Sequence, residues 1–466
     1  MSQPSITVSV PDLESAPPPR ELPDFITVPR RQSRRIRWMV AGSMALLLAL
    51  VGLRLFAVTG WWRTVRIDGA SMAETFLGAH FDVVCDDCGV LFPCDGANPP
   101  RDGRVVCPNC GYRWTSLNEE QLQVGDRVLI DRWRLGGNIP QRGEVVALEG
   151  EKDDYQIKRV VALPGERWGV RDGDLYIDGR IFRKSLHQLL TQRILVHDNN
   201  HQPKRSRDLP PRWQSQGESS RWKPEGSGFV FEPAPKASGD SFDWLRYTHW
   251  RCSGALQERT QSSAVFDNDF YNQALSRNLN WTPDVMLTCT VECDRNGRFS
   301  VAAEDEPHHF EIVFDRRKRS VMLIDHESEQ EVARSDERIF ADAERLEIVV
   351  ALCDQQVIVA EGGQTLITFS YRRYEPCENK QPLSIGGNVG RLKVTNLRVY
   401  RDIYHLDPAG TGRAWEAESA VPRGHVAVLG DNPPISIDSR HTGSLPLRRV
   451  LGTVYRPFWI TPHHAE

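Results

Sequence analysis

The sequence has almost no net charge. Lys and Arg together number 58 and Asp and Glu 62, which gives a formal net charge of −4. Proteins that bind nucleic acid usually carry a basic face, so this balance gives no indication of a nucleic-acid partner. At 466 residues the chain is longer than one typical domain, and we expect two or three domains.

The sequence also lacks a clear small-x-small cleavage site after its apolar stretch, residues 38–58. A cleavable signal peptide is therefore the weaker of two interpretations, and the long polar, proline-rich tail of residues 1–29 weakens it further. A membrane helix needs about 20 apolar residues, and the stretch qualifies if Arg54 extends toward the interface. We therefore predict a disordered tail at 1–37 and a transmembrane anchor at 38–60.

The basic residues between 30 and 37 predict the orientation of this anchor. Positive charges stay on the cytoplasmic side of a membrane. The chain is therefore expected to cross the plasma or inner membrane once, with its N-terminus in the cytoplasm and everything after the anchor on the outer face. The lipid bilayer is accordingly a predicted partner.

Short alternating segments separated by glycines predict a mainly β fold after the anchor. Residues 61–185 form a first part of the core, with the expected strands at 64–67, 125–131, 143–148, 156–161 and 174–179. The same type of pattern resumes at 416–466, which we predict to be the second part of the same core. An insertion between two parts of one fold is tolerated when its ends lie close together.

Residues 186–415 have a different character and are predicted to form an inserted β-sandwich-like domain. Its first hundred residues have no clean period, but alternating runs follow, and Asn296-Gly297 and Gly362-Gly363 supply hairpin turns. The closing stretch, 384–402, resembles the last strands of a laminin-G or concanavalin-like jelly roll.

Three motifs carry candidate chemistry. They are Gly69-Ala70-Ser71-Met72, the segment 158–166 (Lys-Arg-Val-Val-Ala-Leu-Pro-Gly-Glu) and the segment 430–440 (Gly-Asp-Asn-Pro-Pro-Ile-Ser-Ile-Asp-Ser-Arg). A serine becomes a nucleophile only when a base removes its proton. Lysine can be that base if burial lowers its pKa toward neutrality. On a strand Lys158 shares a face with Val160, so we expect Lys158 to point inward and Arg159 outward.

The order and content of these motifs resemble the signal peptidase I family. The resemblance implies a serine protease with Ser71 as nucleophile, Lys158 as general base and Ser436 as the residue that orients the lysine. It also implies a structural clamp between Asp438 and Arg440. The sequence departs from the family pattern at Glu74, where the family has proline, and at Glu166, where it has aspartate.

Small residues next to the nucleophile let a substrate backbone approach closely. We therefore expect the oxyanion and substrate-binding positions to be Gly69, Ala70 and Met72. The resemblance implies cleavage of signal peptides from exported precursor proteins, without a cofactor for catalysis. The alternative is an anchored, non-catalytic scaffold that binds protein or glycan through its inserted segments.

Four cysteines form two Cys-x-x-Cys pairs, each followed by glycine, and predict a zinc ribbon at 82–114. The predicted ligands of this structural zinc are Cys85, Cys88, Cys107 and Cys110. Disulfides remain the alternative, because this segment is expected outside the membrane. Cys94 lies between the pairs and is not expected to be a ligand. Five further cysteines lie in the insert and could form one or two disulfides, whose pairing the sequence does not give.

Overall fold

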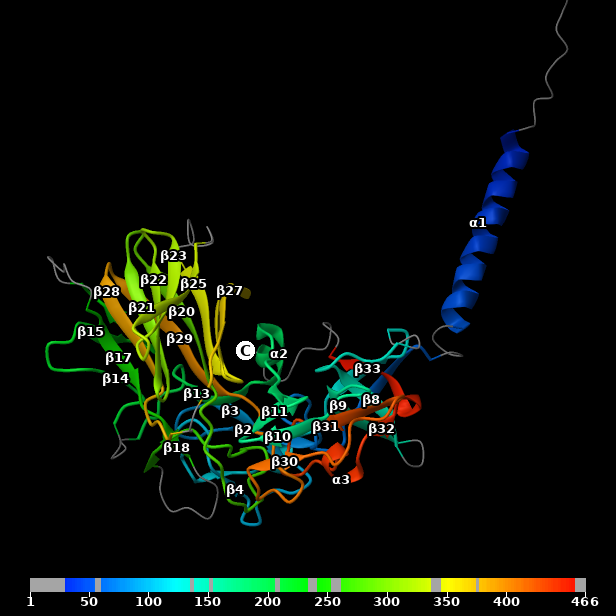
Figure 1. Cartoon of the computed structure of the whole chain (residues 1–466). Helices are drawn as coiled ribbons and strands as arrows, with labels where there is room; N and C mark the ends of the chain where they lie inside the picture. The colour runs from blue at the N-terminus through cyan, green and yellow to red at the C-terminus, as the bar shows by residue number, and fades with distance from the viewer. Residues whose placement is uncertain are drawn as a thin grey trace, which may run out of the picture. The chain divides into compact units, whose positions relative to one another are not determined.

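We obtained a computed structural model of the chain. It describes residues 30–54, 60–134, 138–150, 154–205, 210–233, 241–252, 261–336, 345–373 and 377–456. The chain divides into two units, Met1–Gly60 and Trp61–Glu466. The expected fold class, mainly β with one N-terminal apolar helix, is confirmed (Figure 1). Of the disordered tail predicted at 1–37, residues 1–29 lie outside the described residues, and residues 30–37 belong to a helix instead.

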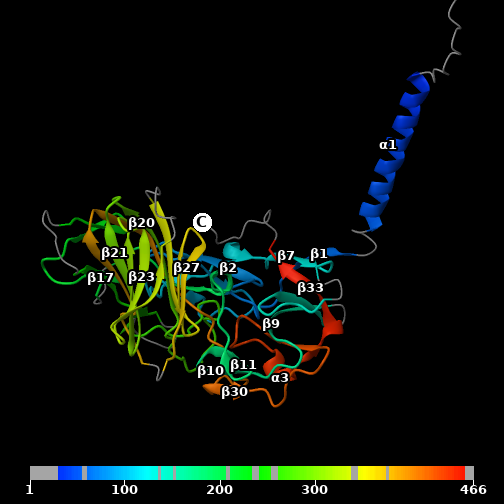
Figure 2. The same cartoon turned by 45° about the horizontal axis from the view of Figure 1, so that its top comes forward.

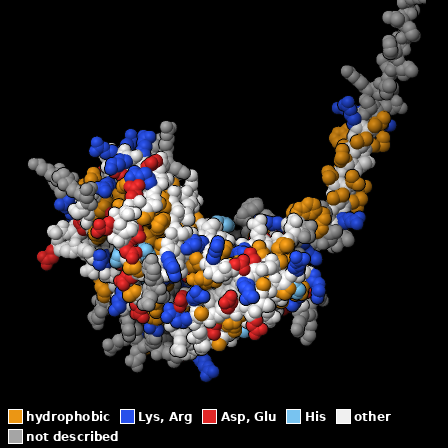
Figure 3. All heavy atoms as spheres, viewed as in Figure 1, with side chains coloured by type: hydrophobic (Ala, Val, Ile, Leu, Met, Phe, Trp, Pro, Cys, Tyr) orange, Lys and Arg blue, Asp and Glu red, His pale blue; other side chains and the backbone are white. Residues whose placement is uncertain are grey.

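The first unit contains one helix, α1 (Arg30–Leu53). Its segment Arg34–Leu53 has 20 residues and is long and apolar enough to cross a membrane. Figure 3 shows hydrophobic side chains along most of this helix and basic ones near its start. Since none of these apolar side chains packs against the rest of the unit, the helix has the composition and length of a membrane span.

The second unit is built on a seven-stranded sheet that joins the two parts of the predicted core. The order of its strands is β1-β7-β33-β8-β9-β31-β32. Their bounds are β1 (Trp62–Arg66), β7 (Arg127–Asp131), β8 (Val145–Glu149), β9 (Tyr155–Ala162), β31 (His425–Leu429), β32 (Leu445–Pro446) and β33 (Val450–Tyr455). Because β9 lies between β8 and β31, distant segments of the chain become neighbours at the centre of the sheet. Two short helices follow β31 and β32, namely α3 (Ser439–Thr442) and η4 (Leu447–Arg449).

A second core sheet has the order β12-β11-β10-β30. Its strands are β10 (Trp168–Arg171), β11 (Asp174–Ile177), β12 (Arg180–Ile181) and β30 (Ala414–Glu416). The chain therefore leaves the core after β12 and returns to it with β30. The ends of the insert lie close together, since β10 pairs with both β11 and β30.

The cysteine-containing segment forms two small sheets between β1 and β7. They are built from β2 (His80–Val84), β3 (Leu91–Asp95), β4 (Arg104–Val105), β5 (Thr115–Ser116) and β6 (Leu122–Gln123). A short helix, η2 (Glu119–Gln121), precedes β6. The cysteines pack with Val83, Phe92 and Val105 in a small core of their own.

Two large antiparallel sheets make up most of the insert, and Figures 1 and 2 show them side by side on the left. One has the order β15-β16-β29-β20-β25-β26-β27, with β13 also pairing with β29, and the other β14-β17-β28-β21-β22-β23-β24. A single hydrophobic core contains buried side chains from both sheets, among them Phe299, Phe310 and Val350. As expected, Gly362-Gly363 forms a two-residue hairpin, and both glycines have positive φ, +54° and +82°. The hairpin expected at Asn296-Gly297 is wrong, because the strands on either side of it, β20 and β21, belong to different sheets.

The strands of the insert have the following bounds. They are β13 (Ile194–Asp198), β14 (Trp213–Ser215), β15 (Trp222–Glu225), β16 (Gly228–Phe231), β17 (Asp243–Tyr247), β18 (Trp250–Arg251), β19 (Gln261–Ser262), β20 (Val285–Cys293), β21 (Arg298–Asp305), β22 (His308–Asp315), β23 (Ser320–Asp325), β24 (Gln330–Ser335), β25 (Arg345–Cys353), β26 (Gln356–Glu361), β27 (Gln364–Ser370), β28 (Leu383–Val389) and β29 (Leu392–Arg401).

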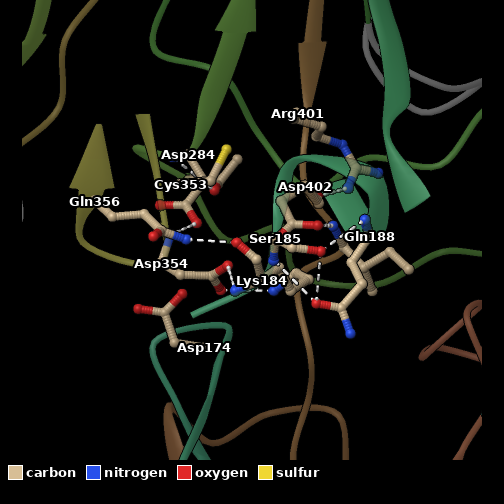
Figure 4. Close-up of polar contacts among 12 residues, drawn as sticks. Asp174, Lys184, Ser185, Gln188, Asp284, Cys353, Asp354, Gln356, Arg401 and Asp402 are labelled. Atoms are coloured by element: carbon tan, nitrogen blue, oxygen red, sulfur yellow. Dashed lines mark hydrogen bonds and ion pairs between the residues drawn. The ribbon is translucent and has the colours of Figure 1, made fainter. Parts of the chain in front are cut away.

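A buried ionic cluster fixes the point where the chain enters the insert (Figure 4). Lys184 Nζ lies 2.5 Å from Asp354 Oδ1 and 2.8 Å from Asp402 Oδ2. Next to it, α2 (Leu186–Gln192) begins with a capping box between Ser185 and Gln188. An ammonium group shared by two buried carboxylates holds three separate segments together, because each charge would be costly to bury alone.

Candidate active site

The structure brings Ser71 and Lys158 together. Ser71 lies in a turn after β1, and Lys158 is in the middle of β9. Lys158 Nζ donates a hydrogen bond of 2.6 Å to Ser71 Oγ. Lys158 is only 5% exposed, because β9 is covered on both sides of the sheet.

The environment of Lys158 favours the neutral amine. Burial lowers its pKa from 10.5 to about 8, while the negative charges of Asp438 and Asp431 act in the opposite direction. An amine with this pKa is deprotonated in a substantial fraction of molecules at mildly alkaline pH. It can then accept a proton from the hydroxyl to which it is hydrogen-bonded.

The loop after β31 packs directly on the serine turn. Asn432 donates from its backbone N–H to Ser71 O at 3.1 Å and from its side chain to Ala70 O at 2.9 Å. A Cβ atom at Gly430 would lie 2.4 Å from Ser71 O and 2.2 Å from Ser436 Oγ. Only glycine therefore allows this close approach of the loop to the serine.

Ser436 is buried beside this contact. Within the described part of the chain its hydroxyl has no hydrogen-bond partner, and the hydrogen bond of Lys158 Nζ goes to Ser71. The resemblance implies that Ser436 orients Lys158, but the structure shows no direct hydrogen bond between these two described residues.

Asp438 and Arg440 form a two-pronged ion pair. Arg440 donates from Nε to Asp438 Oδ1 at 2.9 Å and from Nη2 to Oδ2 at 2.8 Å. Burial raises the pKa of Asp438, but the hydrogen bonds and charge of Arg440 outweigh it, so the pKa lies below its usual value. Arg440 also binds the carbonyls of Leu406 and Pro433, which fixes the shape of the loop.

Arg159 does not point to solvent, which corrects the sequence-based expectation. It is buried and donates to both carboxylate oxygens of Asp431, with a distance of 2.8 Å from Nε to Oδ1. Thr75 Oγ1 donates to the same carboxylate at 2.6 Å. Arg159 does lie on the opposite face of β9 from Lys158, as alternation predicts. That face is covered by the loop after β31, so Arg159 is buried as well.

The three residues around Ser71 occupy different environments. Gly69 is exposed, with open space where a side chain would be, and Ala70 is half-buried. Met72 is 1% exposed and packs in the core with Ile67 and Phe76. Any contact of Met72 with a substrate would therefore have to come from its backbone.

Both departures from the family pattern have partners in the structure. Glu166 accepts from Arg142 at 2.6 Å and from the backbone N–H of Leu163 at 2.7 Å. Glu74 faces the insert, where burial and the charge of Asp269 raise its pKa to about 8, against the effect of Arg401.

The insert reaches the active site, which sequence reasoning did not predict. Asn272 donates to Asn432 Oδ1 at 2.7 Å, and Asn432 donates back to Asn272 Oδ1 at 3.2 Å. Tyr271 is fully buried against Ala73 and Leu77. These residues lie in a segment without periodicity, so no sequence signal marks them.

The four predicted ligand cysteines converge. Their sulfur atoms all lie within 4.8 Å of one another, with distances of 3.7 Å for Cys85–Cys110 and 3.6 Å for Cys88–Cys107. Zinc–sulfur bonds of about 2.3 Å place tetrahedral ligands about 3.8 Å apart, whereas a disulfide is about 2.05 Å long. The donor set thus fits a tetrahedral metal ion.

The remaining cysteines are also free of disulfides. Within the described part of the chain no cysteine forms a disulfide, and Cys377 is the exposed one. Cys94 is buried outside the cluster of four, and burial raises its pKa to about 12.

Fold and site together describe a mainly β protein in which a buried lysine is hydrogen-bonded to a serine hydroxyl. The sequence model of the signal peptidase family (peptidase S26) matches residues 112–259 and 378–459, just under half of the chain. A probable signal peptidase I-2 of Synechocystis sp. is 32% identical over 85 residues, 17% of this chain and 39% of the relative. The matches support the signal peptidase family for this chain.

The family match includes Lys158 and the loop at 430–440, and it begins after Ser71. The chain spans 39% of the length of the curated relative.

Solved structures also match. The carbohydrate-binding module CBM66 of Bacillus subtilis has 8% identity, covers 40% of this chain and 94% of its own, and has a TM-score of 0.27. The β-glucanase of Bacillus licheniformis has 7% identity, covers 41% and 92%, and has a TM-score of 0.26. At such scores these likenesses carry no argument.

Proposed function

We propose that this protein is a membrane-anchored serine endopeptidase that removes signal peptides from exported precursors. The observation that carries the proposal is the hydrogen bond of 2.6 Å from Lys158 Nζ to Ser71 Oγ, together with a lysine pKa lowered to about 8. Ser71 attacks the scissile carbonyl while Lys158 takes its proton. The protonated lysine then supplies a proton to the leaving amine.

The other site residues support this pair. Ser436 and the Asp438–Arg440 clamp hold the loop on which the serine turn rests, and Gly69 and Ala70 leave room for a substrate backbone. Backbone N–H groups of the serine turn are the proposed donors to the oxyanion. The four-cysteine cluster would hold a structural zinc ion, which with four thiolates has no open position for catalysis.

The proposed topology follows from α1 and its flanking charge. The helix crosses the plasma or inner membrane once, the basic N-terminal side faces the cytoplasm, and Trp61–Glu466 lies on the outer face. Exported precursors would meet the site there as they leave the membrane. In the alternative, an anchored scaffold without activity, Ser71 and Lys158 would have no reason to be paired.

The test is cleavage of an exported precursor by full-length protein in detergent. Wild type should cleave, and Ser71→Ala and Lys158→Ala should each lower the rate by several orders of magnitude. Ser219→Ala and Lys223→Ala, at exposed positions of the insert, are matched controls that should keep full activity. Folded wild type that cleaves none of several precursors would support the scaffold instead.

A further inference from the structure

The insert contains a cavity that the proposed peptidase activity does not use. Its volume is 530 Å³, within the range of small-molecule sites, about 300–1,000 Å³. The cavity is bordered by β14, by the hairpin of β15 and β16, and by the segment after β13. Its other border is the second cysteine turn, residues 107–110, which contributes Asn109. None of its lining residues belongs to the serine–lysine site.

One part of the wall is aromatic. Trp213, Trp222, Phe229 and Trp250 contribute to it, and the three tryptophans are at most 5% exposed. The indole N–H of Trp213 is buried and has no hydrogen-bond partner within the part of the chain that the structure describes. A buried donor left unpaired is costly, so a ligand with an oxygen acceptor would satisfy it.

The remaining wall is polar and preformed. Asn109, between two ligand cysteines, donates to His201 O at 2.7 Å, and its own amide oxygen lies 2.7 Å from His197 Nδ1. Asn199 in turn donates to Ser227 O at 2.6 Å. These bonds hold the wall in place before any ligand arrives.

The charge of the lining residues further limits the chemical class of the ligand. Arg205 and Arg212 are its cationic residues, and none of the described lining residues carries a carboxylate. Arg205 stacks on Tyr112, with its guanidinium 4.6 Å from the ring centroid. Such a wall favours a ligand rich in oxygen acceptors and disfavours a cation.

We propose that this cavity binds a saccharide. A pyranose ring has apolar C–H faces that fit an aromatic wall, and its hydroxyl oxygens can accept from the Trp213 N–H and from the exposed amide of Gln214. A proline-rich peptide is the main competitor, since such peptides also dock on aromatic grooves. The volume of the cavity and its separate polar wall favour the sugar.

The experiment is isothermal titration calorimetry on the full-length protein in a detergent without a sugar head group. The probes are lactose, cellobiose, diacetylchitobiose, digalacturonate and decaproline. We expect at least one saccharide to bind, and Trp213→Phe, which removes the N–H together with part of the indole ring, to weaken it at least about tenfold. Trp244→Phe, on β17 and outside the cavity, is the matched control and should leave the affinity unchanged.

A second variant covers the case in which Trp213→Phe does not fold. Ser215→Trp adds a bulky side chain at a half-buried position of the lining and should abolish binding. Failure of every saccharide to bind folded wild type would overturn the proposal, as would binding that both variants leave intact. Binding of decaproline alone would overturn it in favour of a protein partner.

Discussion

Asn272 of the insert and Asn432 of the loop after β31 exchange two side-chain hydrogen bonds, of 2.7 and 3.2 Å. Asn432 in turn donates to Ala70 O and Ser71 O. A continuous chain of hydrogen bonds therefore runs from the insert to Ser71. The insert is part of the support of the active site as well as an addition to its periphery.

Asn272→Ala should slow cleavage because it releases Asn432 and so loosens the turn that holds Ser71. A displacement of the order of 1 Å can cost up to about 100-fold in rate, and we expect a loss of about 10-fold to 100-fold in kcat. KM should change little, since Asn272 acts through Asn432. Steady-state cleavage of a precursor peptide measures both constants.

Asn278→Ala is the control for this variant, since Asn278 is an exposed asparagine of the same segment. It should behave like wild type. Equal kcat for Asn272→Ala and wild type would show that the loop keeps its position without the insert.

Cleavage should increase with pH and reach half its maximum near pH 8. The physical reason is that Lys158 acts as a base only when it is neutral, and burial lowers its pKa to about 8. The measurement is the pH dependence of kcat/KM, which reports the free enzyme. A profile that is flat from pH 6 to 10 would contradict a lysine base.

The same group should link stability to pH. The folded pKa of about 8 lies below the ordinary value of 10.5, so between these values the unfolded chain binds more protons than the folded one. The free energy of unfolding should therefore increase with pH between about 8 and 10.5. Below about pH 8 the amine is protonated in both states and adds no further dependence on pH. The difference between wild type and Lys158→Met, taken from denaturant unfolding at each pH, isolates the effect of this one amine.

Arg440→Met should destabilise the protein and abolish cleavage. It leaves the carboxylate of Asp438 buried without its partner, and breaking such a pair costs about 3–5 kcal/mol. Denaturant unfolding measures the loss. Arg448→Met, at an exposed position nearby, removes an arginine without a buried partner and should have little effect. A loss below 1 kcal/mol in Arg440→Met would mean that the clamp does not hold the loop.

Strands with clean alternation could be predicted because apolar side chains line one face, as Phe310, Ile312 and Phe314 do in β22. Leu346, Ile348 and Val350 do the same in β25. The pairing of β9 with β31, which lie on either side of the insert in the sequence, could be expected only from the motifs. The inward position of Lys158 followed from alternation, but the burial of Arg159 did not, since alternation cannot say what covers the other face. Asp431, which neutralises Arg159, lies in a distant motif. The capping box of Ser185 and Gln188 was a readable signal for α2, whereas Asn272 had none.

Zinc should be present at one equivalent per chain, as measured by elemental analysis of the purified protein. Cys107→Ser removes one of four converging thiolates and should lower both the zinc content and the melting temperature, because metal binding contributes directly to the folding of such sites. Cys94→Ala is the matched control, since Cys94 is buried nearby but outside the cluster, and it should retain zinc. Asn109 joins the second cysteine turn to the insert through His201 O, so loss of zinc should also loosen that contact. If the purified protein is folded and active but contains no metal, the prediction is wrong, and the four thiols serve only to pack the small core.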